Sequence, residues 1–455
     1  MGDALLNLTR QLCEFLCALS SEQLGEANRI DLRYKTLDWL GCVIAAQNGD
    51  VAKRIKGYAR ACGGNPQATA FGLAEKTSVG TAAFCNGMLS HALEYDDTNK
   101  IAITHPGAPV VSAALAEAEA LDASFGQYAL GVAAGYEAMI RMGGAANPDH
   151  YVYWHTTGTC GTFAAAAACA KIMGLSPEQT ETAMGIAATT ASGLVHVFGT
   201  EAKLVTVGNA ARNGAAAAEL AGNWQFTAPE DGFAAERGFA HAARSKDDLS
   251  FMVPKAGDPL MMEDAYYKIH ASCGHTHCAL DALQQLMREN AFGAADVERI
   301  DVAVYKTARE LCSAYNVSTN LKAKFSLPYC IAMMLLNGRV TLSEFTPESL
   351  NSEAAAALGA RVTVREEPAF TAVYPASRPE KVTVTLKDGR TLEKTVNLPE
   401  GRPPHSVIEN KFMSLAEMTL SADEAAAVME RVLGAKDDTR IRDLTDSLRT
   451  MLGRS

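Results

Sequence analysis

Apolar side chains recur at helical spacing through most of the first 262 residues of the chain. Leu8, Leu12 and Phe15 mark one such face, and later segments rich in alanine and glycine continue the pattern. Helices are predicted over residues 4–20, 29–46, 78–93, 110–121, 125–142, 160–173 and 210–221, with another that begins after Ser176 as its N-cap. Because nothing in this part predicts a strand, we expect one all-helical domain, with Lys203 in a loop before residue 210.

The pattern changes after Lys268, where alternating apolar and polar positions predict strands. These strands span residues 297–305, 361–365, 381–386 and 391–396, and helices are predicted over residues 278–289 and 327–336. Asp388 and Gly389 lie between the last two strands, which is typical of a hairpin. Helical spacing returns at residues 422–433 and 441–452. We therefore expect a mainly α protein: a large all-helical domain of residues 1–262 and 401–455, with a smaller, lid-like α+β domain inserted at 263–400.

Composition limits the kinds of partner. The chain has 455 residues, 52 of them acidic and 41 basic, for a formal net charge of -11. This balance argues against a nucleic-acid or anionic-membrane surface but allows a small anionic ligand held by a few local cations. The eleven cysteines form no C-x-x-C pair, and no signal peptide or membrane-length apolar run is evident. We expect a cytoplasmic protein with reduced thiols.

A polar stretch from Ser90 to Pro109 lies between two apolar helical segments. Burying such a stretch is costly unless its groups pair with one another or with a ligand. One interpretation is a wall of an active site; the alternative is a solvated loop. Its chemically active side chains are His91, Glu94, Asp96, Asp97, Thr98 and His105.

Other candidates are His155 before a glycine-containing turn, Lys203, and the run K-I-H-A-S-C-G-H-T-H-C at 268–278. If that run were helical, His270, Cys273 and His277 would share one face, as a zinc site requires. No second Cys/His pair has a zinc-site spacing, so we expect no metal. The chain also lacks a phosphate-binding loop, a dinucleotide fingerprint and a G-x-S-x-G elbow. Histidine, lysine, tyrosine and carboxylate together suit proton abstraction next to a carboxylate, with cations holding the substrate.

At these residues the sequence resembles the MmgE/PrpD family, which includes 2-methylcitrate dehydratases, cis-aconitate decarboxylases and iminodisuccinate epimerases. The resemblance is carried by six motifs in family order: G-G-N-P-Q-A-T-A-F-G (63–72), A-A-F-C-N-G with E-Y-D-D-T (82–98), T-H-P-G-A-P (104–109), G-T-E-A-K-L-V-T-V-G-N-A-A-R-N-G (199–214), K-I-H-A-S-C-G-H-T-H (268–277) and A-K-F-S-L-P-Y-C-I-A (323–332). It implies a homodimer with a cleft between the two domains, and cofactor-free chemistry on small di- or tricarboxylates.

The resemblance also implies roles for individual residues. His105 and His155 are candidate acid/base residues; Asp96 and Asp97 belong to the same catalytic group, where they orient and tune His105 and the lysines. The expected substrate-binding residues are Thr98, Lys203, Lys268, His277 and Tyr329.

Two departures bear on the reaction. Glu94 stands where the decarboxylases have aspartate, and one extra residue separates Thr98 from His105. We expect a hydro-lyase, with decarboxylation or epimerisation as alternatives and a non-catalytic polycarboxylate-binding protein as the rival from another class. The altered spacing is where we expect substrate specificity to be determined.

Overall fold

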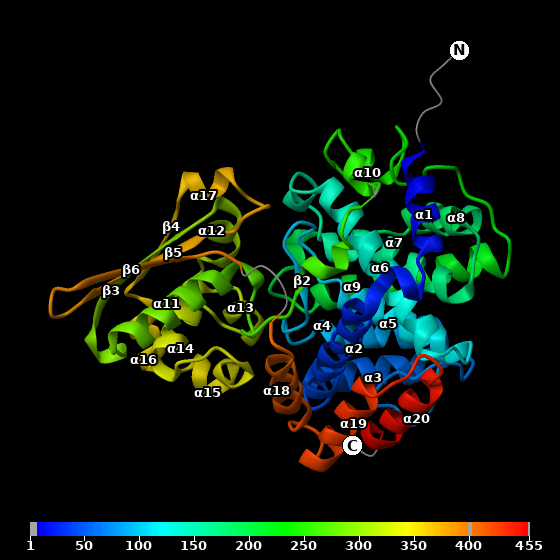
Figure 1. The fold of residues 1–455 in the computed structure, drawn as a ribbon. Helices are drawn as coiled ribbons and strands as arrows, with labels where there is room; N and C mark the ends of the chain where they lie inside the picture. Colours follow the sequence, from blue (N-terminus) through cyan, green and yellow to red (C-terminus); the bar gives the residue numbers. More distant parts are fainter. Residues whose placement is uncertain (1–6, 256, 399–402, 454–455) are drawn as a thin grey trace. The chain divides into compact units, whose positions relative to one another are not determined.

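The computed structural model describes residues 7–255, 257–398 and 403–453 and divides the chain into two compact units (Figure 1). Unit 1 comprises Met1–Tyr267 with Gly401–Ser455, and unit 2 comprises Lys268–Glu400. The sequence placed the first boundary after residue 262. In the structure, a two-residue strand that follows this point pairs back onto unit 1, so the chain leaves unit 1 after Tyr267.

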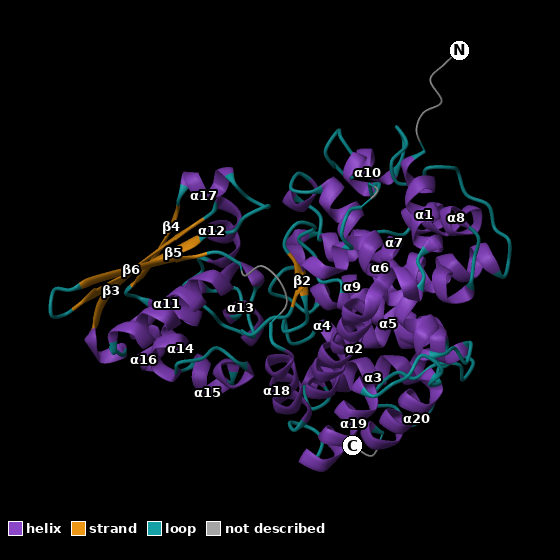
Figure 2. Ribbon diagram, in the orientation of Figure 1, coloured by secondary structure: helices purple, strands orange, loops and turns teal. Residues whose placement is uncertain are grey.

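Unit 1 is built almost entirely from helices, as Figure 2 shows by colour. Its α-helices are α1 (Leu8–Ala18), α2 (Ser21–Ala46), α3 (Asp50–Cys62), α4 (Val79–His91), α5 (Gly107–Ala120), α6 (Phe125–Ala146), α7 (Thr156–Met173), α8 (Pro177–Ala188), α9 (Ala202–Gly222), α10 (Phe239–Ala242), α18 (His405–Ala416), α19 (Ala422–Leu433) and α20 (Ile441–Leu452). The predicted N-cap Ser176 is confirmed, because its hydroxyl accepts from the N–H of Gln179.

Small side chains let the central helices α4, α5, α6, α7 and α9 pack closely. A Cβ added to Gly214 of α9 would lie 2.4 Å from the Cβ of Ala165 in α7. One added to Gly135 of α6 would lie 2.5 Å from a methyl of Val110 in α5. These separations are shorter than carbon atoms tolerate, so the alanine- and glycine-rich composition is a packing requirement.

The C-terminal helices complete unit 1. Helix α18 packs against α2, and α20 packs against α5. The N–H of Phe125 donates to the carbonyl of Thr439 at 2.7 Å, and the N–H of Ile441 donates to the carbonyl of Ala123 at 3.0 Å. Segments more than 300 residues apart therefore share one core, and the mainly α fold class is confirmed.

Two details of unit 1 differ from the sequence-based expectation. Residues 202–209 are helical, so Lys203 lies in the first turn of α9 and not in a loop. Gly208 lies inside this helix, where α4 passes too close for a side chain. In addition, β1 (Thr98–Asn99) pairs antiparallel with β2 (Ala265–Tyr266), a two-residue ladder too short to leave a periodic signal.

Unit 2 contains a four-stranded sheet in the order β4-β3-β5-β6. Strand β3 is parallel to β4 and antiparallel to β5, and β5 forms the predicted hairpin with β6 around Gly389, whose φ is 89°. Helix α11 packs against β5 and β6. The strands are β3 (Val297–Val304), β4 (Val362–Glu366), β5 (Glu380–Leu386) and β6 (Thr391–Val396); the helices are α11 (His277–Asn290), α12 (Lys306–Cys312), α13 (Asn320–Ala323), α14 (Leu327–Asn337), α15 (Pro347–Leu350), α16 (Glu353–Gly359) and α17 (Pro368–Ala372).

Among the described residues, no helix combines the length and the apolar character that a membrane crossing needs.

Candidate active site

The close approach of α4 and α9 brings a lysine to a carboxylate. A Cβ on Gly87 of α4 would lie 3.2 Å from the Cα of Gly208, and a Cβ on Gly208 would lie 2.6 Å from the carbonyl oxygen of Phe84. Just past the end of α4, Glu94 adopts a left-handed backbone conformation with φ 52°. Its buried carboxylate forms an ion pair with the ammonium of Lys203 in α9. Left-handed non-glycine residues are costly and concentrate at functional sites.

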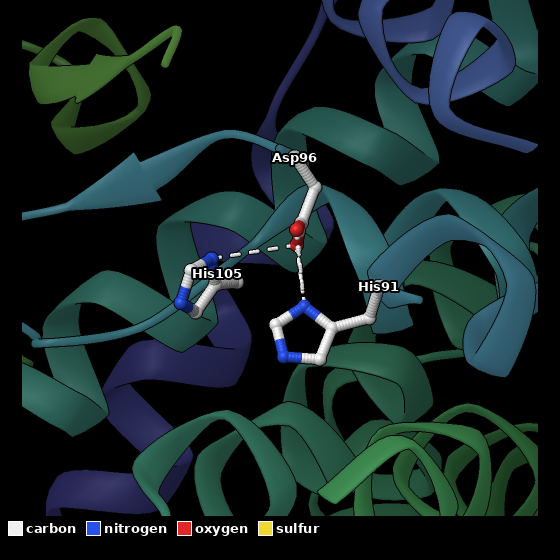
Figure 3. Close-up of side chains that lie close together, drawn as sticks. All are labelled: His91, Asp96 and His105. Atoms are coloured by element: carbon white, nitrogen blue, oxygen red, sulfur yellow. Dashed lines mark hydrogen bonds and ion pairs between the residues drawn. The ribbon is translucent and has the colours of Figure 1, made fainter. Parts of the chain in front are cut away.

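Asp96 lies between two histidines. Its carboxylate accepts from the Nδ1 of His91 at 2.8 Å, and the Nδ1 of His105 lies 3.4 Å from the same oxygen. Figure 3 shows the two imidazoles on either side of the carboxylate, each with its second ring nitrogen turned away from it. The ring centroids of His91 and His105 are 4.7 Å apart. We call His91, Asp96 and His105 the His–Asp–His cluster.

Charge holds Asp96 ionised in spite of its burial. Burial by itself would raise the pKa of this carboxyl, but the neighbouring His91 and His105 outweigh that effect, and the pKa lies well below the usual range. The cluster therefore contains a permanent anion at neutral pH. An ionised carboxylate stabilises the protonated form of an adjacent imidazole.

Asp97 faces a different way and anchors the backbone. Its carboxylate accepts from the N–H of Gly107, the first residue of α5, at 2.8 Å and from the hydroxyl of Tyr136 at 2.6 Å. A side chain on Gly107 would collide with both groups. Burial raises the pKa of Asp97 to about 6, although the charge of Lys35 opposes the shift. Asp97 thus fixes the start of α5, two residues after His105.

The segment from Thr98 to His105 is closed by short-range hydrogen bonds. The hydroxyl of Thr98 donates to the carbonyl of Thr104 at 2.9 Å. The N–H of His105 donates to the hydroxyl oxygen of Thr157 at 3.1 Å, and its Nδ1 donates to the carbonyl of Asp97 at 3.0 Å. These contacts fix the ring of His105, whose side chain retains 15% exposure, whereas that of His91 has none.

His155 joins the same group from the N-cap position of α7. Its backbone N–H donates to the carbonyl of Gly193 at 3.0 Å, and its ring stacks at 6.1 Å from that of His91. The hydroxyl of Thr206 donates to the carbonyl of Lys203 at 2.7 Å, so its oxygen accepts from the Nδ1 of His155 at 2.9 Å.

That arrangement fixes the tautomer of His155. Nδ1 carries the proton, which leaves Nε2 as the proton acceptor in the neutral ring. Burial, reinforced by the positive charge of Lys203, holds the pKa of His155 well below its ordinary value. His155 is therefore a neutral base at physiological pH, whereas His105 lies beside a carboxylate.

The remaining predicted site residues belong to unit 2; they are Lys268, His277 and Tyr329. Lys268 is fully buried, and the Nε2 of His277 lies 3.3 Å from the carbonyl oxygen of Ser272. The hydroxyl of Tyr329 donates to the carbonyl of Glu344 at 2.6 Å, and burial raises the pKa of the phenol. The structure thus brings together Asp96, His105, His155 and Lys203 within unit 1.

The helix considered for a zinc site is absent at the expected place. Helix α11 begins only at His277, so His270 and Cys273 do not share a helical face with it, and His270 instead pairs with Asp281 at 2.9 Å. Within the described ranges, the group whose donor atoms are close enough to hold a metal is the His–Asp–His cluster. Its Nδ1 atoms already have acceptors in Asp96 and in the carbonyl of Asp97.

Comparisons with known proteins agree with these motifs. The model of the MmgE/PrpD N-terminal domain matches residues 10–252, and that of the MmgE/PrpD C-terminal domain matches residues 270–435. The chain belongs to the MmgE/PrpD family. Family membership covers both units, and the six motifs quoted from the sequence fall within or at the edges of the two matched ranges.

Several relatives carry the name cis-aconitate decarboxylase. The human protein of that name is 28% identical over 88% of this chain and 86% of its own length. The protein from Aspergillus terreus is 23% identical over 98% of this chain and 97% of its own. A cis-aconitate decarboxylase-like protein, oryM, from Aspergillus oryzae is 24% identical over 96% of each chain.

Sequence reasoning noted His91 and Glu94 but assigned neither a role, and it missed Thr206. His91 carries a signal in hindsight, because it lies at the last turn of an apolar helix and five residues before Asp96. Thr206 carries no such signal in the sequence, since its contact with His155 depends on residues 202–209 being part of helix α9.

Proposed function

We propose that this protein is a cofactor-independent lyase that acts on a small di- or tricarboxylate by proton transfer next to a carboxylate. The observation that carries the proposal is the contrast between two histidines. His155 is buried and neutral, with Nε2 available as a base, whereas His105 lies against the ionised Asp96. We therefore assign His155 as the base and His105, beside the ionised carboxylate of Asp96, as the acid.

Lys203 supplies the positive charge that such a substrate needs. It lies in the first turn of the 21-residue helix α9, where a cation is unfavourable for the helix dipole. Its ammonium is held by Glu94 and lies 5.1 Å from the ring centroid of Phe198. Glu94 supplies one carboxylate beside this cation, and we infer that a substrate carboxylate is the second, since the N-terminus of a helix also favours an anion.

Among lyase reactions we propose decarboxylation of an unsaturated tricarboxylate first, because relatives at 23–28% identity are named cis-aconitate decarboxylases. The bond between carbon and the leaving carboxylate breaks and CO₂ departs. The electron pair moves through the adjacent double bond to the next carbon, which takes a proton from the imidazolium of His105. Solvent then restores that proton. Lys203 stabilises the charge that develops on the remaining carboxylates.

A hydro-lyase is the second candidate, because a neutral His155 and a His105 beside Asp96 offer the base and the acid that dehydration needs. The longer carboxylate next to Lys203, where the decarboxylases have aspartate, alters the space available to the substrate. In this reaction His155 removes the α-proton, the C–O bond breaks, and His105 protonates the departing hydroxide to give water. An epimerase would use the same two groups to remove and return one proton. The expected homodimer remains part of this proposal.

Incubation with a panel of polycarboxylates in D₂O, followed by NMR, separates these reactions. Citrate, methylcitrate, cis-aconitate, tartrate and iminodisuccinate cover the three alternatives. Decarboxylation releases CO₂ and leaves deuterium at the protonated carbon, dehydration changes the number of hydroxyls, and epimerisation exchanges only the α-proton. Lys203→Ala is expected to abolish deuterium incorporation in each reaction, and His155→Ala to abolish it in dehydration or epimerisation, where His155 removes the α-proton. Normal exchange in both variants would contradict the residue assignment, and ligand-induced thermal stabilisation without any product would favour the non-catalytic rival.

A further inference from the structure

A second group of charged residues is buried inside unit 1, on helix α2. Asp31, Lys35 and Asp38 of α2 each retain only 2% exposure. The ammonium of Lys35 lies 3.1 Å from the carboxylate of Asp31, which also accepts from the hydroxyl of Tyr267 at 2.7 Å. Burying charges is expensive even when they are paired, so such a group needs an explanation beyond fold stability.

A contact between Asp38 and Lys411, which lies near the other end of the chain, offers such an explanation. Lys411 of α18 places its ammonium 2.6 Å from the carboxylate of Asp38 and donates to the carbonyl of Tyr95, also at 2.6 Å. The same ammonium lies 4.3 Å from the centroid of the Tyr95 ring. Lys411 is 9% exposed, and these contacts join α2, α18 and the segment that follows α4.

Tyr95 immediately precedes Asp96, so Lys411 holds the peptide from which the carboxylate of the His–Asp–His cluster extends. The preceding residue, Glu94, has a left-handed backbone, so the chain bends sharply here. A charge-assisted hydrogen bond to a carbonyl at this bend fixes the direction in which Asp96 leaves the backbone. The contact therefore sets the position of the anion between His91 and His105.

Electrostatic coupling supports the same connection. Burial raises the pKa of Asp38, and the charge of Asp96 adds to that shift, whereas Lys411 opposes it. Asp38 and Asp96 thus interact through the protein interior, and Lys411 is the cation placed between the buried carboxylate and the catalytic segment. Burial by itself would lower the pKa of Lys411, but the charge of Asp38 and its other neighbours outweigh burial and raise the pKa, so Lys411 stays protonated.

We propose that Lys411, held by Asp38, is a positioning residue that fixes Asp96 relative to His105 during proton transfer. It does not touch the substrate. This inference rests on the proposed function for its kinetic consequences, but the arrangement of the cluster can be measured without turnover. Its sequence position, more than 300 residues after Asp96, hides this role from motif analysis.

The kinetic test compares Lys411→Met with Lys76→Met. Lys76 is a matched control because its ammonium also pairs with a buried carboxylate, that of Glu119, at 2.9 Å. Its ion pairs, with Glu119 and Asp446, include no residue of the His–Asp–His cluster. Misplacement of a catalytic group by about 1 Å costs on the order of 100-fold, so Lys411→Met is expected to lower kcat by that factor with little change in KM. Lys76→Met is expected to keep its kcat. A Lys411→Met protein with wild-type kcat overturns the proposal.

The double variant Asp38→Asn with Lys411→Met separates positioning from stability. Removing both charges relieves the unpaired buried carboxylate, so the unfolding midpoint is expected to return toward that of the wild type. The kcat is expected to stay low, because the ammonium that donates to the carbonyl of Tyr95 is not restored. Recovery of kcat together with stability would assign Lys411 a structural role only and overturn the proposal.

Histidine-selective ¹⁵N NMR gives a readout that does not depend on turnover. Lys411→Met is expected to shift the imidazole signals of His91 and His105, assigned with His91→Gln and His105→Gln, whereas Lys76→Met leaves them in place. If the wild-type protein converts no polycarboxylate, the proposed function fails while this measurement still tests Lys411. Unchanged imidazole signals in a folded Lys411→Met protein overturn the inference.

Discussion

Asp97→Asn should change how the stability of unit 1 depends on pH. The folded pKa of Asp97 is about 6, above its usual value of 3.8, because the carboxyl is buried. At pH 7 the carboxyl is ionised in both states, and the folded state bears the whole cost of the buried charge. That cost is about 3 kcal/mol, from roughly 2.2 pH units at 1.36 kcal/mol each.

The sign of the effect follows from these two values. As pH falls through 6, the folded protein takes up a proton that the unfolded chain binds only below about 4. The wild type therefore gains about 1.3 kcal/mol of stability from this group between pH 7 and pH 5. The amide introduced by Asp97→Asn cannot titrate, so the variant lacks this gain. Titrating groups that do not interact with Asp97 cancel in the difference between the two proteins.

Urea unfolding followed by tryptophan fluorescence measures this difference for unit 1. The chain has three tryptophans, Trp39, Trp154 and Trp224, and all of them belong to unit 1. The difference in unfolding free energy between wild type and variant is expected to move in favour of the wild type from pH 7 to pH 5. A difference that stays constant over this range, or moves the other way, refutes the reasoning about Asp97.

Three further outcomes are expected. Gly208→Ala should destabilise unit 1 by about 1–3 kcal/mol, because its methyl would lie 2.6 Å from the carbonyl oxygen of Phe84, whereas Gly57→Ala, with open space around it, should be neutral or stabilising in the same urea assay. Burial raises the pKa of Glu117 to about 8, so the unfolding free energy of the wild type should fall by about 1.3 kcal/mol between pH 7 and pH 9 as this carboxyl ionises. Glu117→Gln should lack this decrease, and plots of unfolding free energy against pH that run parallel for the two proteins would contradict the reasoning. Dialysis against EDTA should leave turnover unchanged, since the Nδ1 atoms of His91 and His105 already donate to Asp96 and to the carbonyl of Asp97; a loss of turnover restored by zinc would contradict that expectation.

The periodic parts of the fold were predictable from the sequence. The hairpin around Gly389 and the N-cap at Ser176 are encoded by a few neighbouring residues, and both are confirmed. The course of residues 202–209 was not predictable in this way, because a glycine inside a helix has the same local signal as a glycine that ends one. Only the neighbouring helix α4 explains why Gly208 is there.

The candidate site could likewise be predicted from the sequence only in part. Motifs identified His105, His155 and Lys203 as a group, and the structure places them around one cluster. The acidic motif also identified Asp96 as the partner of His105, but the partner of His155 could not be found from spacing. Thr206 fixes the tautomer of His155 through a hydroxyl on another helix, and that depends on tertiary packing.

The order of the units along the chain has a consequence for biosynthesis. Unit 2 is one continuous stretch, so its whole sequence emerges from the ribosome before α18 does. Unit 1 cannot finish folding until α18–α20 emerge, and until then Asp38 lacks its ion pair with Lys411 of α18. During translation, the smaller unit is thus the first that can fold completely, and the larger one must keep an unfinished core from aggregating for the time needed to synthesise the remaining residues.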